Sequence, residues 1–208
     1  MNLRALPLLL LATTLSALAT FEVVLQPDAD VGKDSYTLWG QGNFGNRYNL
    51  FVSESDGRTY LEFVELDDYS GEGLTLVSAE LGVYVFGIVH DRPNSRGGLL
   101  IAPADEAWEE MTITWSNQPD PLYQYELEGS VDDDSPSDHW DYLDVTGIVA
   151  LWLDETIPNH GFVIYNHQGI FDVEFTSSDA VGYWPKLTLT LDNPAVEEAS
   201  WGAIKAGF

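Results

Sequence analysis

The sequence predicts an all-β protein, an antiparallel β-sandwich or jelly roll with one short helix. Apolar and polar residues alternate with a period of two in many short segments, whereas helical spacing is rare. Loops rich in Gly, Asp, Ser and Pro separate these segments. About eight or nine short strands with such turn signals are typical of a sandwich and unlike alternating βα units.

Residues 185–191, Pro-Lys-Leu-Thr-Leu-Thr-Leu, form the clearest predicted strand. Its three leucines point to one face, and Lys186 points to the other with two threonines. Residues 80–86 alternate in the same way, with Leu81 and Val83 on one face. Further strands are predicted over residues 21–25, 50–52, 59–64, 111–115, 161–165 and 171–175.

One helix is expected after Asp144, whose carboxylate is suited to cap the first turn. The residues that follow place an apolar stripe at helical spacing: Val145, Ile148, Val149 and Trp152. A second helical turn is expected near Pro103, and the acidic segment 126–138 is expected to be a solvated loop.

The chain is expected to divide into a signal peptide (1–19), one sandwich domain (20–192) and a C-terminal tail (193–208) compatible with a short helix. Arg4, the apolar run 5–15 and Ala17-Leu18-Ala19 match the parts of an export signal. This run is shorter than the roughly 20 residues that cross a bilayer. We therefore expect a secreted protein, extracellular or at the cell surface, that does not span a membrane.

Charge and composition exclude several classes of protein. The 34 Asp and Glu residues against 8 Lys and Arg give a formal net charge of −26. Nucleic-acid binding is excluded, because phosphate contacts require clustered Lys and Arg. Hydrophobic residues make up 45% of the chain, which is enough for a packed core. Since the chain has no cysteine, core packing or bound ions must stabilise it in place of disulfides.

Calcium is the cofactor that the first loop suggests. Asp28, Asp30 and Asn43 carry the hard oxygen ligands that Ca²⁺ prefers, although their spacing is not that of an EF-hand. The run 132–134, Asp-Asp-Asp, offers the same ligands, but a solvated acidic loop is the favoured interpretation there.

Catalysis has little support in the sequence. The four histidines form no H-E-x-x-H zinc motif, and no G-x-S-x-G nucleophile elbow occurs. Paired carboxylates for glycoside cleavage depend on three-dimensional separation, so a lyase or hydrolase on the same scaffold stays open as an alternative. We expect no enzyme and assign no catalytic residue.

Exposed aromatic side chains are the candidate ligand contacts. Trp39, Arg47 and Tyr48 flank or lie in a loop rich in Gly and Asn, where a ring can stack on the apolar face of a sugar while the guanidinium donates hydrogen bonds. A core position is favoured instead for three other tryptophans: Trp108, Trp115 and Trp140.

Four landmarks resemble the DNRLRE family, a group of exported β-sandwich domains similar to carbohydrate-binding modules. They are Asp28-Ala29-Asp30 with Asn43-Phe44-Gly45 and residues 50–52; Tyr60-Leu61-Glu62-Phe63 with residues 78–84; the segment 108–119, Trp-Glu-Glu-Met-Thr-Ile-Thr-Trp-Ser-Asn-Gln-Pro; and residues 144–146 with 175–180 and Pro185-x-Leu187. The segment 108–119 is the most specific, and together the landmarks span residues 23–191.

This resemblance implies a non-catalytic module that binds a polysaccharide or a cell-surface matrix. The chain departs from the family at Glu62, where relatives often have Arg, so a contact made by that Arg is missing here. The acidic surface favours a neutral glycan unless calcium bridges an acidic one. A structural component of a surface assembly remains the other non-catalytic alternative.

Overall fold

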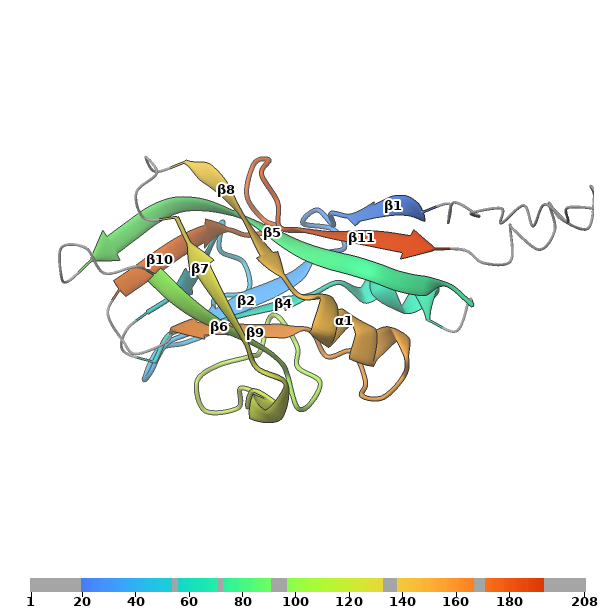
Figure 1. The fold of residues 1–208 in the computed structure, drawn as a ribbon. Coiled ribbons are helices and arrows are strands. Elements are labelled where there is room, and N and C mark those ends of the chain that lie inside the picture. Colours follow the sequence, from blue (N-terminus) through green and yellow to red (C-terminus); the bar gives the residue numbers. More distant parts are fainter. Residues whose placement is uncertain are drawn as a thin grey trace, which may run out of the picture.

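The protein is a sandwich of two antiparallel sheets in a computed structural model that describes residues 20–53, 56–70, 73–90, 97–132, 138–166 and 171–192 (Figure 1). The first sheet has six strands: β1 (Thr20–Leu25), β11 (Lys186–Asp192), β5 (Thr75–His90), β10 (Phe171–Thr176) and β3 (Asn49–Val52) in this order, and β8 (His139–Asp144), which pairs with β5. The second sheet has five: β2 (Lys33–Thr37), β4 (Arg58–Glu62), β9 (Phe162–Asn166), β6 (Gly97–Pro103) and β7 (Leu127–Val131). The all-β prediction is confirmed.

Strand β5 is the long central strand of the first sheet. One edge pairs with β11 from Thr75 to Gly82 and then with β10 from Val85 to His90. The other edge pairs with β8. Irregularities in register lie where β5 meets β11 and β10, and such bulges let a strand bend.

Side chains alternate between the core and the outside as the sequence predicts. In β5, Leu81, Val83 and Val85 are buried between the sheets. The three leucines of β11 join them in the same core, whereas Lys186 and its neighbouring threonines face outward. The period of two therefore sets which face of the sheet each residue occupies.

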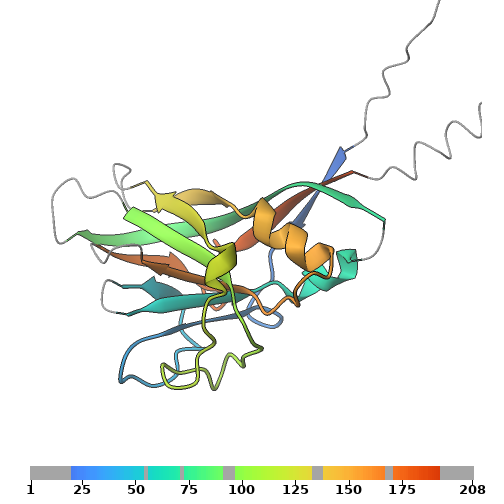
Figure 2. The same cartoon turned by 60° about the horizontal axis from the view of Figure 1, so that its bottom comes forward.

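The predicted helix is α1 (Thr146–Leu153), which lies with the 3₁₀ helix η1 (Val64–Tyr69) at one end of the sandwich (Figure 2). The Asp144 carboxylate accepts a hydrogen bond from the Thr146 amide at 3.0 Å, and hydrogen bonding by the Thr146 side chain and then by this amide lowers the pKa of Asp144. All four predicted stripe residues, from Val145 to Trp152, are buried. The helix is confirmed, whereas its N-cap residue is Val145 and Asp144 lies one position before it.

Three local predictions are wrong. Residues 111–115 form turns in place of a strand, because the amides of Thr112 and Ile113 both donate to the Glu109 carbonyl. Pro103 ends strand β6 and begins no helical turn. Residues 127–131 of the supposed solvated loop form β7, which pairs with β6; a second 3₁₀ helix, η2 (Tyr123–Tyr125), precedes it.

The segment 108–119 covers the outer face of the second sheet. The Trp108 indole donates to the His160 carbonyl at 2.9 Å, and the Tyr60 hydroxyl donates to the Pro119 carbonyl at 2.9 Å. A second small core forms under this cover from Tyr60, Ala104, Trp108, Ile113 and Val163. The most specific landmark of the sequence therefore has a packing role, and Trp108 is a core residue as predicted.

Glu62, the departure from the family pattern, has its own partner. Its carboxylate forms an ion pair with Lys33 at 2.7 Å, and both side chains are largely shielded from solvent. The Lys33 ammonium also lies 4.8 Å from the Trp108 ring centroid. Glu62 thus neutralises the charge of Lys33, whose ammonium packs on a ring of the second core.

The loop after β2 is fastened to the segment 108–119 by Asn43. Its amide nitrogen donates to the carbonyls of Glu110 and Ile113 at 2.6 and 2.8 Å. Its oxygen accepts the Gly45 amide at 3.1 Å. Gly45 passes so close that an added Cβ would lie 2.7 Å from the Glu110 carbonyl carbon, whereas a Cβ on Gly42 would meet open space.

These two glycines give a matched pair of substitutions. We expect Gly45→Ala to lower the free energy of unfolding by about 1–3 kcal/mol, because the methyl group forces two packed loops apart. Gly42→Ala should change it by less than about 0.5 kcal/mol. Chemical denaturation of both variants measures this, and equal stabilities would contradict the close contact between the loops.

Candidate functional site

A cluster of aromatic rings lies on the outer face of the first sheet. The rings belong to Tyr84, Trp140, Tyr142 and Tyr183. We call these four residues, together with Lys186, the aromatic surface. Strand pairing aligns most of it: Tyr84 pairs with Trp140, while Gly82 lies between Tyr142 on β8 and Lys186 on β11. Because the neighbouring residues of β5 and β11 face the core, these side chains point away from the second sheet.

The rings contact one another closely. Tyr84 stacks on Tyr183 with centroids 4.2 Å apart, and Trp140 meets Tyr84 edge to face at 5.5 Å. Trp140 and Tyr142 are nearly parallel, with an interplanar angle of 21° and centroids 6.1 Å apart. Tyr142 and Tyr183 remain 48% and 56% exposed. Rings held by their neighbours yet open to solvent are suited to stack on a ligand.

Lys186 places a cation over two of these rings. Its ammonium lies 4.3 Å from the Trp140 centroid and 5.1 Å from that of Tyr142, and it donates to the Tyr142 hydroxyl at 3.3 Å. Gly82 makes room for it, since an added Cβ there would lie 2.9 Å from the lysine Cε. Within the described part of the chain, no carboxylate lies within ion-pairing distance of Lys186.

Tyr183 reaches the aromatic surface from the loop between β10 and β11, which rises above the first sheet (Figure 1, orange-red). Its backbone is left-handed, with φ of 57°, and its carbonyl accepts a hydrogen bond from the Thr176 hydroxyl. Farther along the loop, the Trp184 indole donates to the Ala180 carbonyl at 2.6 Å. These contacts hold the Tyr183 ring over Tyr84.

The predicted ligand residues Arg47 and Tyr48 lie next to this loop. The Tyr48 carbonyl accepts the Ser177 amide at 3.1 Å, and the Arg47 carbonyl accepts the Ser177 hydroxyl. The Tyr48 ring is 63% exposed and lies 6.5 Å from the ring of Phe86 on β5. Tyr48 therefore borders the same sheet as the aromatic surface, whereas the Arg47 guanidinium lies 5.9 Å from the Phe44 ring.

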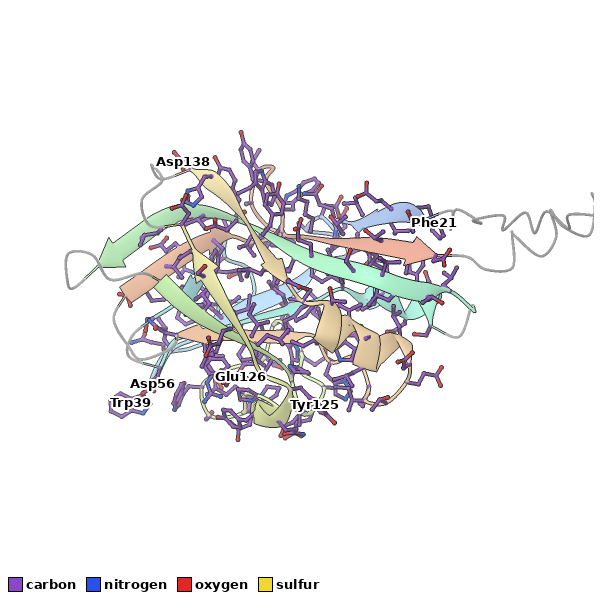
Figure 3. The ribbon with its side chains drawn as sticks, in the orientation of Figure 1. Phe21, Trp39, Asp56, Tyr125, Glu126 and Asp138 are labelled. Carbon is purple, nitrogen blue, oxygen red and sulfur yellow. The ribbon has the colours of Figure 1, made fainter. Side chains whose placement is uncertain are left out.

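Trp39, the third predicted ligand residue, lies elsewhere. It follows β2 of the second sheet, is 73% exposed, and appears beside Asp56 at one end of the molecule (Figure 3). Its ring contacts none of the other described aromatic rings. The structure thus separates Trp39 from the rings on the first sheet, and its role as a ligand contact stays a prediction.

Trp140 is the main residue that sequence reasoning assigned differently. It was expected in the core, but it is only partly buried and its side chain faces outward from β8. Trp115 is also partly buried. The signal that could have identified Trp140 is the spacing Trp140-x-Tyr142, which puts two rings on one face of a strand.

The predicted calcium ligands have other bonds in the structure. Asp28 accepts the amide of Asp30 at 3.0 Å, and the side chain of Asn43 makes the three hydrogen bonds described above. In the ranges that the structure covers, no three His, Cys, Asp or Glu side chains gather as a metal site. The calcium site at Asp28, Asp30 and Asn43 stays a prediction.

Comparison with protein families identifies the class of protein to which this sandwich belongs. The model of carbohydrate-binding module family 96 matches residues 26–191, and the chain belongs to this family. The match supports the carbohydrate-binding character that the sequence resemblance implied. No curated protein matches the chain.

A buried carboxylate holds the base of the loop that carries Tyr183. Asp34 on β2 accepts the Ser178 amide at 2.7 Å, and its own amide donates to Glu110 at 3.2 Å. Burial raises the pKa of Asp34 to about 7, the Ser178 hydrogen bond opposes the rise, and the negative charges of Glu110 and Asp179 add to it. The folded protein therefore holds a proton here that the unfolded chain releases near pH 4.

We expect this proton to make the domain less stable as pH rises from about 4 to 7, because the unfolded state ionises first. Asp34→Asn keeps an acceptor for Ser178 and removes the titration. The free energy of unfolding of the variant, relative to that of the wild type, should therefore rise by roughly 1–4 kcal/mol from pH 4 to pH 8. Denaturant unfolding of both proteins at the two pH values measures this; a constant stability difference would contradict a raised pKa.

Proposed function

We propose that the protein is a secreted, non-catalytic module that binds a polysaccharide through the aromatic surface. The observation that carries this proposal is the ring cluster itself: Tyr142 and Tyr183 are about half exposed, yet Trp140, Tyr84 and Lys186 hold them in place. Exposed aromatic residues that are already ordered cost little conformational entropy on binding. Family membership supports carbohydrate as the ligand class.

Each part of the aromatic surface has a role in this proposal. The faces of Tyr142 and Tyr183 stack on the apolar faces of sugar rings, which is how aromatic side chains contribute apolar contact area. The Lys186 ammonium and the tyrosine hydroxyls donate hydrogen bonds to sugar oxygens. Tyr48 and Phe86 extend the contact area toward the edge strand β3.

A neutral glycan fits the charge of the protein best. The formal net charge of −26 repels acidic polysaccharides unless a divalent cation lies between them. Among the described residues, Lys186 is the one cation that belongs to the aromatic surface, and it already lies over two rings. A single ammonium suits a hydroxyl or ring oxygen of a neutral sugar.

The proposed location is outside the cell. The described part of the chain contains no helix that is both long enough and apolar enough to cross a bilayer. The predicted export signal and the predicted tail lie outside the described residues, so both remain sequence predictions. Outside the cell, such a module meets its ligand in a surface matrix or an extracellular polysaccharide.

The aromatic surface predicts specific losses of affinity. We expect Tyr142→Ala and Tyr183→Ala each to weaken binding at least about fivefold, equivalent to about 1 kcal/mol, because each removes one stacking face. Titration calorimetry with cellohexaose, xylohexaose, laminarihexaose and mannohexaose measures the affinities. Polygalacturonate with and without calcium serves as the acidic comparison.

Trp39→Ala is the matched control, since it removes an exposed ring that lies apart from the aromatic surface. A loss of affinity in Trp39→Ala, with Tyr142→Ala and Tyr183→Ala unaffected, would move the site to the end of β2. Wild-type protein is also incubated at length with each glycan and the products are analysed. New reducing ends or unsaturated sugars would contradict a non-catalytic role.

A further inference from the structure

A second group of rings lies on the outer face of the second sheet. The rings belong to Trp115, Tyr123 and Tyr165. We call these residues, together with the charged residues Arg58, Asp120 and Glu126, the opposite surface. Arg58 on β4 pairs with Tyr165 on β9, and both alternate with residues that face the main core. Their side chains therefore point away from the first sheet.

Arg58 connects the charged and aromatic parts of the opposite surface. Its guanidinium carbon lies 5.8 Å from the Trp115 ring centroid, and one of its nitrogens forms an ion pair with Asp120 at 3.2 Å. The Asp120 side chain is 71% exposed, so it offers a free oxygen beside the ring. The largely shielded guanidinium, whose side chain is 18% exposed, thus links the exposed carboxylate to the partly buried indole.

The tyrosines extend this arrangement along the strand. Tyr123 on η2 is 57% exposed and meets Tyr165 edge to face, with centroids 6.4 Å apart. The Tyr165 hydroxyl donates to the Glu126 carboxylate. Burial and this carboxylate raise the pKa of Tyr165, so its phenol stays protonated and keeps the hydrogen bond in place.

Backbone contacts fix the loop that carries the opposite surface. The Ala104 amide donates to the Gly161 carbonyl at 2.9 Å, and the Leu122 amide donates to the Pro103 carbonyl at 2.8 Å. The Asp120 amide donates to the Asp105 carboxylate at 2.9 Å. Rings and charges are therefore held in position before any ligand arrives.

We propose that the opposite surface is a second glycan-binding surface, and that the module bridges two polysaccharide chains. This inference rests on the proposed function of the aromatic surface. Trp115 and Tyr123 supply stacking faces, and the carboxylates of Asp120 and Glu126 accept hydrogen bonds from sugar hydroxyls. Arg58 holds Asp120 and the Trp115 ring in position. Because carboxylates line this surface, its ligand is a neutral glycan.

The sandwich itself separates the two surfaces. Asp138, which begins the segment leading into β8, and Glu126 appear on opposite sides of the molecule (Figure 3). Two packed sheets about 10 Å apart lie between the outer faces. A short oligosaccharide on one face cannot reach the other, so a module with both surfaces binds two chains at once. Bridging then strengthens attachment to a matrix through multivalency.

The experiment uses the four neutral hexasaccharides named above and the corresponding long soluble polysaccharides. Calorimetry gives the number of hexasaccharides per module, and co-sedimentation and viscosity report bridging of long chains. The variants are Tyr123→Ala and Trp115→Ala on the opposite surface and Tyr142→Ala on the aromatic surface. Met111→Ala, an exposed residue of the same covering loop, is the matched control, and thermal unfolding of each variant verifies folding.

We expect two hexasaccharides per wild-type module. Tyr123→Ala and Tyr142→Ala should each weaken one of the two binding events at least about fivefold, leave the other unchanged and reduce bridging, while Met111→Ala retains both events. If Tyr123→Ala fails to fold, Trp115→Ala should give the result expected for it.

If the wild-type module binds one hexasaccharide, and only Tyr142→Ala weakens that binding, the second surface would be overturned and the proposed function would stand. A stoichiometry of one that responds to Tyr123→Ala alone would overturn bridging and move the site to the second sheet. Failure of the wild-type module to bind any of the glycans would overturn both proposals.

Discussion

The pairing of β5 with β8 on one edge and β11 on the other is the interaction on which the arrangement of this molecule depends. It brings Tyr142 and Lys186 together on either side of Gly82. A side chain at position 82 would crowd both of them. On the opposite face of the same strands, it aligns Leu81 and Leu187 in the core. One register therefore determines both the packing of the sandwich and the position of the aromatic surface.

Loops on this scaffold are held by buried polar contacts in place of disulfides. Asn43 joins the loop after β2 to the covering segment, and Asp34 joins β2 to the loop that carries Tyr183. A buried donor or acceptor that loses its partner costs about 1–3 kcal/mol, so each contact restricts the loops to one arrangement. The landmark residues of the sequence accordingly include packing residues such as Trp108 and Gly45 as well as surface residues such as Trp115.

Period-two alternation predicted the fold well where one face of a strand is apolar and the other polar, as in β11 with its leucines and threonines. It missed β8, because this strand has large apolar side chains on both faces: Trp140 and Tyr142 on the outer face and Leu143 on the inner face. The two faces therefore do not differ clearly in polarity. It predicted a strand at 111–115, where Ile113 enters the second core from a turn and Asn43 supplies the hydrogen bonds.

The candidate site was predicted less completely, because its members come from separate segments. Tyr48 was identified from its own loop, yet its neighbour Phe86 and the loop bearing Tyr183 are distant in sequence. Stacking of Tyr183 on Tyr84 depends on a left-handed residue and a buried carboxylate, and neither leaves a local pattern in the sequence. Local spacing in the sequence predicts which face of a strand a side chain occupies. Which loops contact one another can be seen only in the three-dimensional structure.

The central claim is that sugar contacts the rings on the outer face of the first sheet. The most direct measurement is a series of ¹H–¹⁵N spectra that follow the tryptophan indole signals as a neutral hexasaccharide is added. We predict that the signal of Trp140 shifts with the ligand, while those of the buried Trp108 and Trp152 stay in place. A shift confined to Trp39, with Trp140 unchanged at saturating ligand, would contradict this account.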